Sequence, residues 1–234
     1  MIDFHTHILH GIDDGARDYV ESKNLLKEAK ENGFHKIIST SHYALNAYEV
    51  PEYKRINLID DLKSDVSDVD IILGSEIFLS YNILDLLSEY KASTINHTRY
   101  ILFELPLRNH FPNLKDTINK LKDNNYKLIL AHPERYKIVQ DNFEMLKEFR
   151  DMGILFQANY CSIIGLYGLK AKLVLKKMLK YNLVDFLGSD VHRVNTIYPK
   201  VQRSINKISK FISKEYLDDL TTNNAEIILK GDNL

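Results

Sequence analysis

Short apolar runs alternate with longer amphipathic segments along the whole chain. The runs are rich in isoleucine, leucine and aromatic side chains, which is typical of β-strands. An N-terminal strand carries His5 and His7, and we predict six more strands at 34–40, 70–73, 99–105, 126–131, 154–158 and 183–187. Between them the apolar positions recur at the spacing of helices with one buried face.

The first of these helices shows the pattern clearly. Asp18 followed by Glu21 has the spacing of a capping box, and Gly33 is placed to end the helix. A later helix contains Phe143 and ends at Gly153, and the others are predicted at 52–66, 114–124, 169–179, 201–212 and 216–229. The stretch 80–98 is less regular and indicates a short helix with a surface excursion.

Strands that alternate with helices favour parallel strands joined by right-handed crossovers. Seven such βα units in 234 residues predict an α/β fold, namely a closed or nearly closed, distorted TIM-like barrel. Neither an internal repeat nor a linker divides the chain, so we expect a single domain over 1–234.

Composition and charge exclude several classes of protein. The 31 lysines and arginines nearly balance the 32 acidic residues, so no nucleic-acid partner is expected. We expect no membrane insertion, because no long apolar stretch is present, and the default location is cytoplasmic. The single cysteine, Cys161, is followed six positions later by Tyr167, where cysteine-based phosphatases need an arginine. Cys161 is therefore expected to be a small residue packed near the rim of the barrel.

Potential metal ligands follow nearly every predicted strand. His5 and His7 occupy alternate positions, so in an extended strand both imidazoles leave the same face. The other candidates are Asp13 or Asp14, His42, Glu76, Glu104, His132, Asp190 and His192. In a βα barrel the carboxyl ends of the strands meet at one face. Carboxylates crowded there would repel one another without cations, so we predict two or three divalent ions.

The series of motifs resembles the PHP-domain (polymerase and histidinol phosphatase) superfamily. Within it, the chain is similar to the manganese-dependent tyrosine phosphatases of bacterial capsule and exopolysaccharide operons. The matching segments lie between Met1 and His192 in the family's order: I-D-F-H-T-H with I-D-D-G-A, I-I-S-T-S-H-Y, L-G-S-E-I, Y-I-L-F-E-L, L-A-H-P-E-R-Y and G-S-D-V-H.

This resemblance implies a trinuclear metal centre. The first ion would be held by His5, His7, Glu76 and Asp190. Glu76 would bridge to the second ion, which also takes Glu104 and His132, and the third would be held by Asp14, His42 and His192. Asp14 is preferred to Asp13 because it directly precedes the Gly-Ala pair of the motif. We expect Mn²⁺, with iron or zinc as alternatives, because mixed imidazole and carboxylate sites accept all three.

The resemblance also implies an arginine that clamps phosphate, here Arg135. A guanidinium can bind phosphate oxygens bidentately. The family usually has an asparagine directly after the last histidine and a second arginine a few residues later. Here Arg193 follows His192, and either Arg193 or Lys200 could supply that second cation. The residues expected to act directly in catalysis are therefore Arg135, Glu76 and His192.

Three functions agree with this pattern. The favoured one is a metal-dependent phosphatase of phosphotyrosine proteins, acting on a cognate bacterial tyrosine kinase that controls capsule or exopolysaccharide synthesis. The second is a small-molecule phosphoesterase of the histidinol-phosphatase type, and the third is a non-catalytic PHP scaffold. The first is favoured because the E-L after the fourth strand and the H-P-E-R-Y segment resemble the capsule-type enzymes. In that reaction a metal-activated water attacks phosphorus without a covalent phosphoenzyme.

Overall fold

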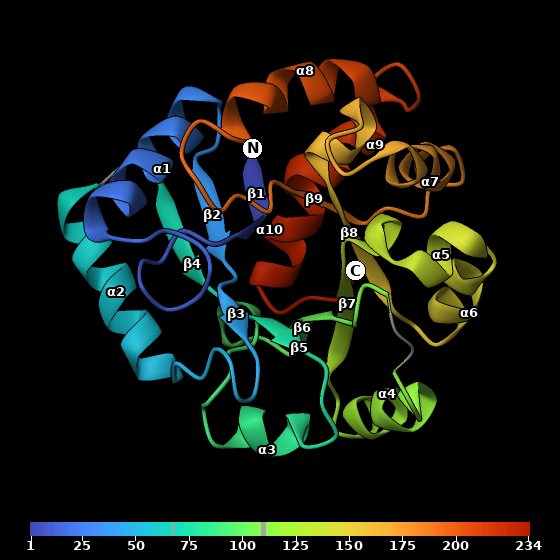
Figure 1. Cartoon of the computed structure of the whole chain (residues 1–234), viewed down its shortest axis with the longest axis horizontal. Helices are drawn as coiled ribbons and strands as arrows, with labels where there is room; N and C mark the ends of the chain where they lie inside the picture. Colours follow the sequence, from blue (N-terminus) through green and yellow to red (C-terminus); the bar gives the residue numbers. More distant parts are fainter. Residues whose placement is uncertain (67, 109–110) are drawn as a thin grey trace.

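The computed structural model describes residues 1–66, 68–108 and 111–234, and most of its helices form a ring around the strands (Figure 1). In these ranges the strands are β1 (Ile2–Thr6), β2 (Lys36–Ser39), β3 (His42–Tyr43), β4 (Asp70–Leu73), β5 (Glu76–Phe78), β6 (Tyr100–Glu104), β7 (Lys127–Ala131), β8 (Leu155–Asn159) and β9 (Phe186–Gly188). The helices are α1 (Tyr19–Glu31), α2 (Glu52–Asp65), α3 (Ile83–Ser88), α4 (Leu114–Asp123), α5 (Lys137–Asp141), α6 (Met145–Asp151), α7 (Leu169–Lys180), α8 (Tyr198–Ile208), α9 (Lys214–Asp218) and α10 (Asn224–Leu229).

All strand pairs are parallel, in one sheet of order β1-β2-β4 and a second of order β3-β5-β6-β7-β8-β9. The chain passes from the first sheet to the second at β2–β3 and again at β4–β5. On the other side, β1 meets the end of β9, where the Asp190 amide donates to the His5 carbonyl at 2.8 Å. The predicted distorted barrel of seven βα units is therefore confirmed, with two of its strands broken into pairs.

Because of these breaks, two predicted strand boundaries were wrong. The predicted strand 34–40 ends at Ser39, and His42 opens β3 instead of lying beyond a strand. In the same way Glu76, expected after a strand, is the first residue of β5. Each break frees backbone groups from the sheet, and such groups need other partners when they are buried.

A buried arginine supplies these partners. The guanidinium of Arg55 donates to the carbonyls of Ser41 and His42 and to the Ser75 hydroxyl, each at 2.8 Å, and to the Val50 carbonyl at 2.9 Å. Arg55 is wholly buried, and burial lowers its pKa to about 10, so it stays charged at neutral pH. One side chain of α2 thus holds both breaks and fixes the backbone that carries His42.

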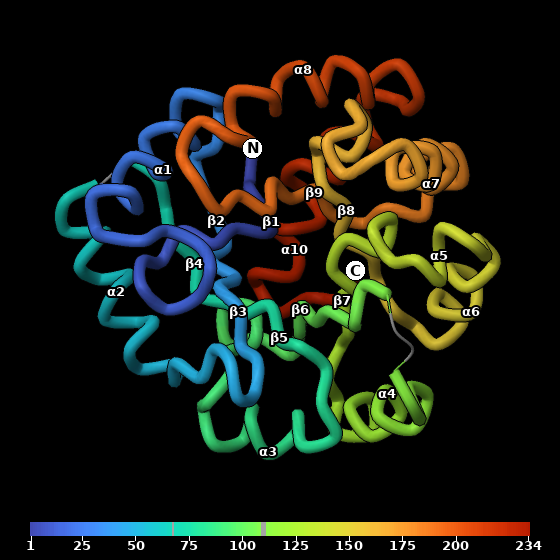
Figure 2. Tube along the Cα trace, in the orientation of Figure 1, coloured from blue at the N-terminus to red at the C-terminus, as the bar shows by residue number. Residues whose placement is uncertain are grey.

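The side chains that point from the strands into the barrel form two layers, one apolar and one polar. The apolar layer is a cluster of buried side chains in which Phe4 stacks on Phe186 with ring centroids 4.1 Å apart. Helix α10 closes the barrel on the side of this layer and adds three of its side chains to the cluster. The cluster comprises Ile2, Phe4, Ile38, Ile95, Tyr100, Leu102, Ile129, Ala131, Phe186, Ala225, Ile228 and Leu229. In Figure 2 both chain termini lie inside the ring of helices.

An irregularity in β1 lets this strand contribute to both layers. Ile2 and Phe4 belong to the apolar cluster, whereas the next candidate ligands, His5 and His7, are at odd positions. Regular alternation cannot place Phe4 and His5 on one face. The register of β1 against β2 shifts between Asp3 and Thr6, as a β-bulge would do. The bulge explains how an apolar residue and a histidine can follow one another inside the barrel.

Several helix predictions are confirmed with small corrections. The Asp18 carboxylate accepts from the Glu21 amide at 2.8 Å, but the Glu21 carboxylate accepts from the Arg17 amide instead of returning to Asp18. Helix α8 begins and ends earlier than 201–212, and α5 was not predicted as a separate helix. The predicted helix 216–229 is α9, a π-helical turn and α10 in succession. Within the described ranges, none of the helices has the length and apolar character needed to cross a membrane.

We expect Arg55→Met to destabilise the fold, because it removes the donors of three backbone carbonyls. Unsatisfied buried acceptors cost ~1–3 kcal/mol each, so the free energy of unfolding should fall by at least about 3 kcal/mol. For a chain of this size that lowers Tm by about 6–12 °C in a thermal melt. Arg203→Met, at an exposed position of α8, is the matched control and should change Tm little. Equal melting of the two variants would contradict the role given to Arg55.

Candidate metal centre

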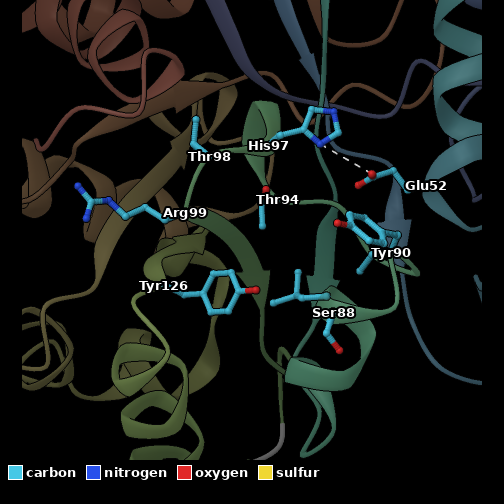
Figure 3. A pocket seen from close by; sticks show the side chains of 10 residues that line it. Glu52, Ser88, Tyr90, Thr94, His97, Thr98, Arg99 and Tyr126 are labelled. Atoms are coloured by element: carbon cyan, nitrogen blue, oxygen red, sulfur yellow. Dashed lines mark ion pairs between the residues drawn. The ribbon is translucent and has the colours of Figure 1, made fainter.

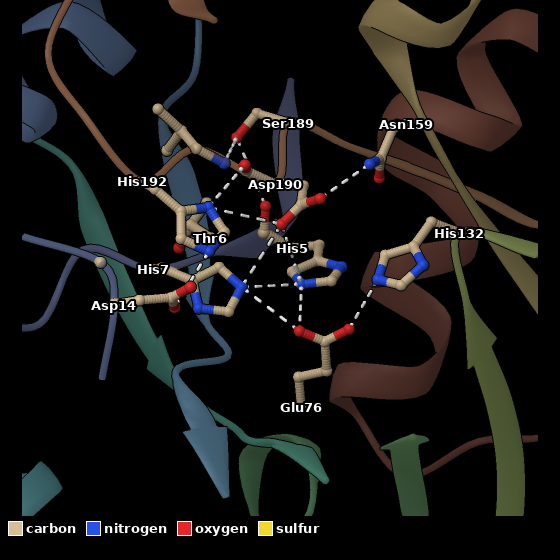
Figure 4. A network of polar contacts seen from close by, with 12 residues as sticks. His5, Thr6, His7, Asp14, Glu76, His132, Asn159, Ser189, Asp190 and His192 are labelled. Carbon is tan, nitrogen blue, oxygen red and sulfur yellow. Dashed lines mark hydrogen bonds and ion pairs between the residues drawn. The ribbon is translucent and has the colours of Figure 1, made fainter. Parts of the chain in front are cut away.

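The nine predicted ligands lie together at the end of the barrel where β1, β6, β7 and β9 finish, with His42 and Glu76 at the breaks in the two divided strands. Figure 4 shows most of them around Glu76. Their nitrogen and oxygen atoms form four overlapping groups, each within 4.8 Å: His7, Asp14, His42 and His192; His5, His7 and Asp190; His5, Glu76 and His132; and His42, Glu76 and Glu104. Each of the first three groups contains residues predicted to share an ion, but His7 also joins Asp14, His42 and His192, and His5 also joins Glu76 and His132. Glu104 groups with His42 instead of His132.

The orientation of His5 and His7 tests whether metal ions fit here. His5 Nδ1 lies 2.7 Å from Gln157 Oε1, the side-chain amide oxygen, and His7 Nδ1 lies 2.8 Å from Asp13 Oδ2. Both Nδ1 atoms therefore carry protons in the neutral rings, and both Nε2 atoms present lone pairs. Yet these two Nε2 atoms are 3.0 Å apart, and each is within 3.3 Å of Glu76 Oε2. Acceptors converging on one point fit a bound cation.

The carboxylates lead to the same conclusion. Burial and the neighbouring Glu76 raise the pKa of Glu104 to about 9. Burial lowers the pKa of His5, but Glu76 and Asp190 outweigh it and raise that pKa above its ordinary value. The cluster thus favours added positive charge, either as protons or as metal ions. Divalent ions would satisfy several carboxylates and imidazoles at once.

The two aspartates of the first loop have different places. Asp14 Oδ1 lies 3.3 Å from His192 Nε2 and 3.6 Å from His42 Nε2, so Asp14 belongs to the cluster. The Asp13 side chain is buried behind His7 and accepts from His7, from the His42 amide and from the Gly15 amide. Burial alone would raise the pKa of Asp13, but these bonds hold it below its ordinary value. This geometry fits Asp14 as a ligand and Asp13 as the residue that orients His7.

The backbone is strained or crowded at the same end of the barrel. His132 and Asp190 have φ values of 35° and 55°, a region that non-glycine residues rarely adopt. Such strain concentrates at functional sites, where surrounding structure holds it in place. Gly15 is equally constrained, since a Cβ there would lie 2.2 Å from the His7 carbonyl oxygen. Only glycine lets the loop of Asp13 and Asp14 approach His7 so closely.

Two polar residues of β8 also adjoin the cluster and were not predicted from the sequence. Gln157 and Asn159 are wholly buried. Gln157 Nε2 donates to Asn159 Oδ1 at 3.0 Å, and Asn159 Nδ2 donates to Asp190 Oδ2 at 2.9 Å. Together with the bond from His5, these contacts link two candidate ligands through neutral amides. The alternation of Gln157 and Asn159 at a strand end was the available signal.

Arg135 lies at the edge of the cluster. Its Nη1 is 2.5 Å from Asp190 Oδ2, so it pairs with a candidate ligand and not with Glu134, which accepts from Ser162 and the Asn159 amide. The two alternative cations contact the backbone. Arg193 donates to the Gly15 and His192 carbonyls, and Lys200 donates to the Thr196 carbonyl. Cys161 is wholly buried, as expected.

Another cavity lies away from the candidate ligands. It has a volume of about 500 Å³, and the residues that line it include Arg99, directly before β6, and Tyr126, directly before β7 (Figure 3). It therefore opens at the amino ends of these strands, away from the candidate ligands. Its ionic contact joins His97 to Glu52 at 3.7 Å. In barrels of this type reactive groups gather at the carboxyl ends, so the metal cluster is the better candidate site.

Comparison with known families now adds to this geometry. Residues 1–230 match the profile of the family described as capsular polysaccharide synthesis, CpsB/CapC. The chain belongs to the CpsB/CapC family. The resemblance to the capsule-type PHP phosphatases is thereby confirmed.

Curated members of the CpsB/CapC family align over nearly the whole chain. The tyrosine-protein phosphatase CpsB of Streptococcus agalactiae is 28% identical over 240 residues, covering 99% of both chains. The tyrosine-protein phosphatase YwqE of Bacillus subtilis is 30% identical over 236 residues, covering 99% of this chain and 92% of YwqE.

Solved structures agree with this assignment. One chain from the crystal structures of YwqE from Bacillus subtilis and CpsB from Streptococcus pneumoniae, described as unique metal-dependent tyrosine phosphatases, superposes with a TM-score of 0.93 at 27% identity. It covers 100% of this chain and 96% of that one. A histidinol phosphate phosphatase from Lactococcus lactis shares the fold, with a TM-score of 0.58, 14% identity and coverage of 89% and 92%.

We expect Asp13→Ala to weaken metal binding without unfolding the chain. The variant frees His7 to adopt the wrong tautomer, and losing such an orienting carboxylate typically lowers metal affinity ~10–100-fold. Bound Mn²⁺ should be measured after equilibration in graded metal buffers, with circular dichroism as the check of folding. Asp18→Ala, which removes a helix cap in the same part of the chain, should leave the affinity unchanged. An Asp13→Ala variant with wild-type affinity would remove Asp13 from the site.

Proposed function

We propose that this chain is a metal-dependent phosphatase that hydrolyses phosphotyrosine in proteins. The observation that carries the proposal is the cluster of five histidines and four carboxylates with an arginine at its edge. Family membership supports it, because the curated relatives are named tyrosine-protein phosphatases. We further propose that the substrate is the tyrosine-containing tail of a bacterial kinase that controls capsule or exopolysaccharide synthesis.

The proposed cofactor is a set of two or three divalent ions, with Mn²⁺ as the first choice. His5, His7, Glu76 and Asp190 hold one ion, and Glu76 also reaches a second with His132 and Glu104. A third is held by Asp14, His42 and His192. The positions of His5, His7 and Glu76 support this assignment, since their acceptor atoms already converge. Glu104 is the exception, because its Oε1 lies 3.3 Å from His42 Nδ1 and it groups with His42 and Glu76.

The side chains have distinct tasks in the proposed reaction. Bound divalent ions would polarise the phosphoryl oxygens and lower the pKa of a water molecule. Arg135 binds the remaining phosphoryl oxygens and neutralises the charge that builds up on them. Gln157 and Asp13 keep the Nε2 atoms of His5 and His7 directed at the site. Glu76, wholly buried, keeps the two adjoining ligand groups at a fixed separation.

The test is a comparison of substrates with the metal-reconstituted protein. We expect hydrolysis of a phosphotyrosine peptide and little or none of histidinol phosphate. Glu76→Gln should bind less metal and lose on the order of a hundredfold or more in turnover, because Glu76 serves two ions at once. Higher kcat/KM for histidinol phosphate would favour the small-molecule phosphoesterase. Activity on neither compound would favour the non-catalytic scaffold, and near-normal turnover by Glu76→Gln would remove its bridging role.

Arg135 offers a test that separates binding of phosphate from binding of metal. Arg135→Ala should keep its metal, because Asp190 retains its bond to Asn159. Its kcat/KM on a phosphotyrosine peptide should fall roughly a hundred- to thousandfold, as expected for the loss of ~3–4 kcal/mol of transition-state stabilisation. Arg135→Lys should also be impaired, since lysine lacks the planar fork. Full activity would move the clamp to Arg193 or Lys200, and lost metal would make Arg135 a structural residue.

A further inference from the structure

A second, basic cleft adjoins the metal centre. It has a volume of about 390 Å³ and lies between the segment that follows β6, the start of α5 and the start of α7. Four cationic side chains line it: Arg108, Arg135, Lys137 and Lys170. Arg135 also pairs with Asp190 at 2.5 Å. One guanidinium is therefore shared by the cleft and the metal centre.

The charge of this cleft is strongly one-sided. The described residues that line it include no carboxylate. Two carboxylates pair with its cations from outside the lining: Asp190 with Arg135, and Asp141 with both Lys137 and Lys170. Four cations set against two carboxylates leave the cleft positive, and a concave positive surface concentrates anions near it.

Several contacts fix the position of Arg135 between the cleft and the metal centre. The Arg135 guanidinium lies over the Tyr167 ring, 4.7 Å from its centroid. Gln140 Nε2 donates to the carbonyls of Glu134 and Arg135 at 3.0 and 3.4 Å. These contacts hold Arg135 from its ring face and from its backbone. A group bound by Arg135 in the cleft would thus meet a side chain that is held in place next to the metal centre.

We propose that this cleft binds a second anionic side chain of the substrate, next to the phosphotyrosine whose phosphate lies at the metal centre. The inference rests on the proposed phosphatase function and specifies which phosphopeptides the site prefers. An anionic neighbour is either an acidic residue or another phosphotyrosine. Both meet the same cations, and the phosphoryl group, with its larger charge, binds more strongly.

The experiment measures both binding and turnover. Three peptides of equal length carry one phosphotyrosine flanked by neutral residues, by glutamates, or by a second phosphotyrosine. Matching peptides with a non-hydrolysable phosphonate analogue at the central position give Kd by fluorescence anisotropy. The proteins are the wild type, Lys170→Glu and the double variant Lys137→Glu/Lys170→Glu. The control is Lys27→Glu on α1, across the ring from α5 and α7 in Figure 1.

For the wild type we expect the anionic peptides to bind and react better than the neutral one, by about tenfold at low salt, with a preference that shrinks as salt screens the charges. The double variant should abolish or reverse this preference, Lys170→Glu should reduce it, and Lys27→Glu should keep it. Equal Kd values for neutral and anionic peptides in the wild type would overturn the cleft proposal. An equal loss of affinity for all three peptides in the double variant would also overturn it. Absence of hydrolysis with the preference in Kd intact would instead overturn the phosphatase function alone.

Discussion

The structure depends on a convergence of hydrogen-bond acceptors that only added positive charge can stabilise. Proton-bearing Nδ1 atoms of His5 and His7 are held by Gln157 and Asp13, so the Nε2 lone pairs face each other and the Glu76 carboxylate. An uncompensated arrangement of this kind is costly in a buried site. Packing in the apolar layer and among the helices stabilises the fold and offsets this cost. The acceptors can therefore remain in place to bind metal ions.

Much of the fold and of the site could be predicted because both follow simple periodicities. Alternate inward positions put Leu102 in the apolar layer and Glu104 in the polar one, and the same step leads from Phe186 through Gly188 to Asp190. Ligands at the ends of successive strands, in a chain that alternates strands and helices, indicate one shared face. The motif series then assigns the family, and the match over residues 1–230 confirms it.

The features that sequence reasoning missed depend on register and on long-range contacts. Arg55 has the pattern of an ordinary charged residue in an amphipathic helix, and only the fold shows that it fills two strand breaks. The bulge in β1 has no glycine or proline to mark it. The motif favoured Asp14 over Asp13, but the contact of Asp13 with His7 depends on the loop conformation that Gly15 permits. Each of these features depends either on a contact between residues far apart in the sequence or on a backbone conformation that the sequence does not reveal.

The most direct test of the account is to locate the ions themselves. Crystals of the protein grown with Mn²⁺ would be measured on both sides of the manganese absorption edge, so that anomalous difference peaks mark manganese alone. We predict two or three peaks at the carboxyl end of the barrel, one of them in contact with His5, His7 and Asp190 and adjacent peaks sharing Glu76. A single peak, or peaks remote from Glu76 in crystals with full metal loading, would contradict the multinuclear centre.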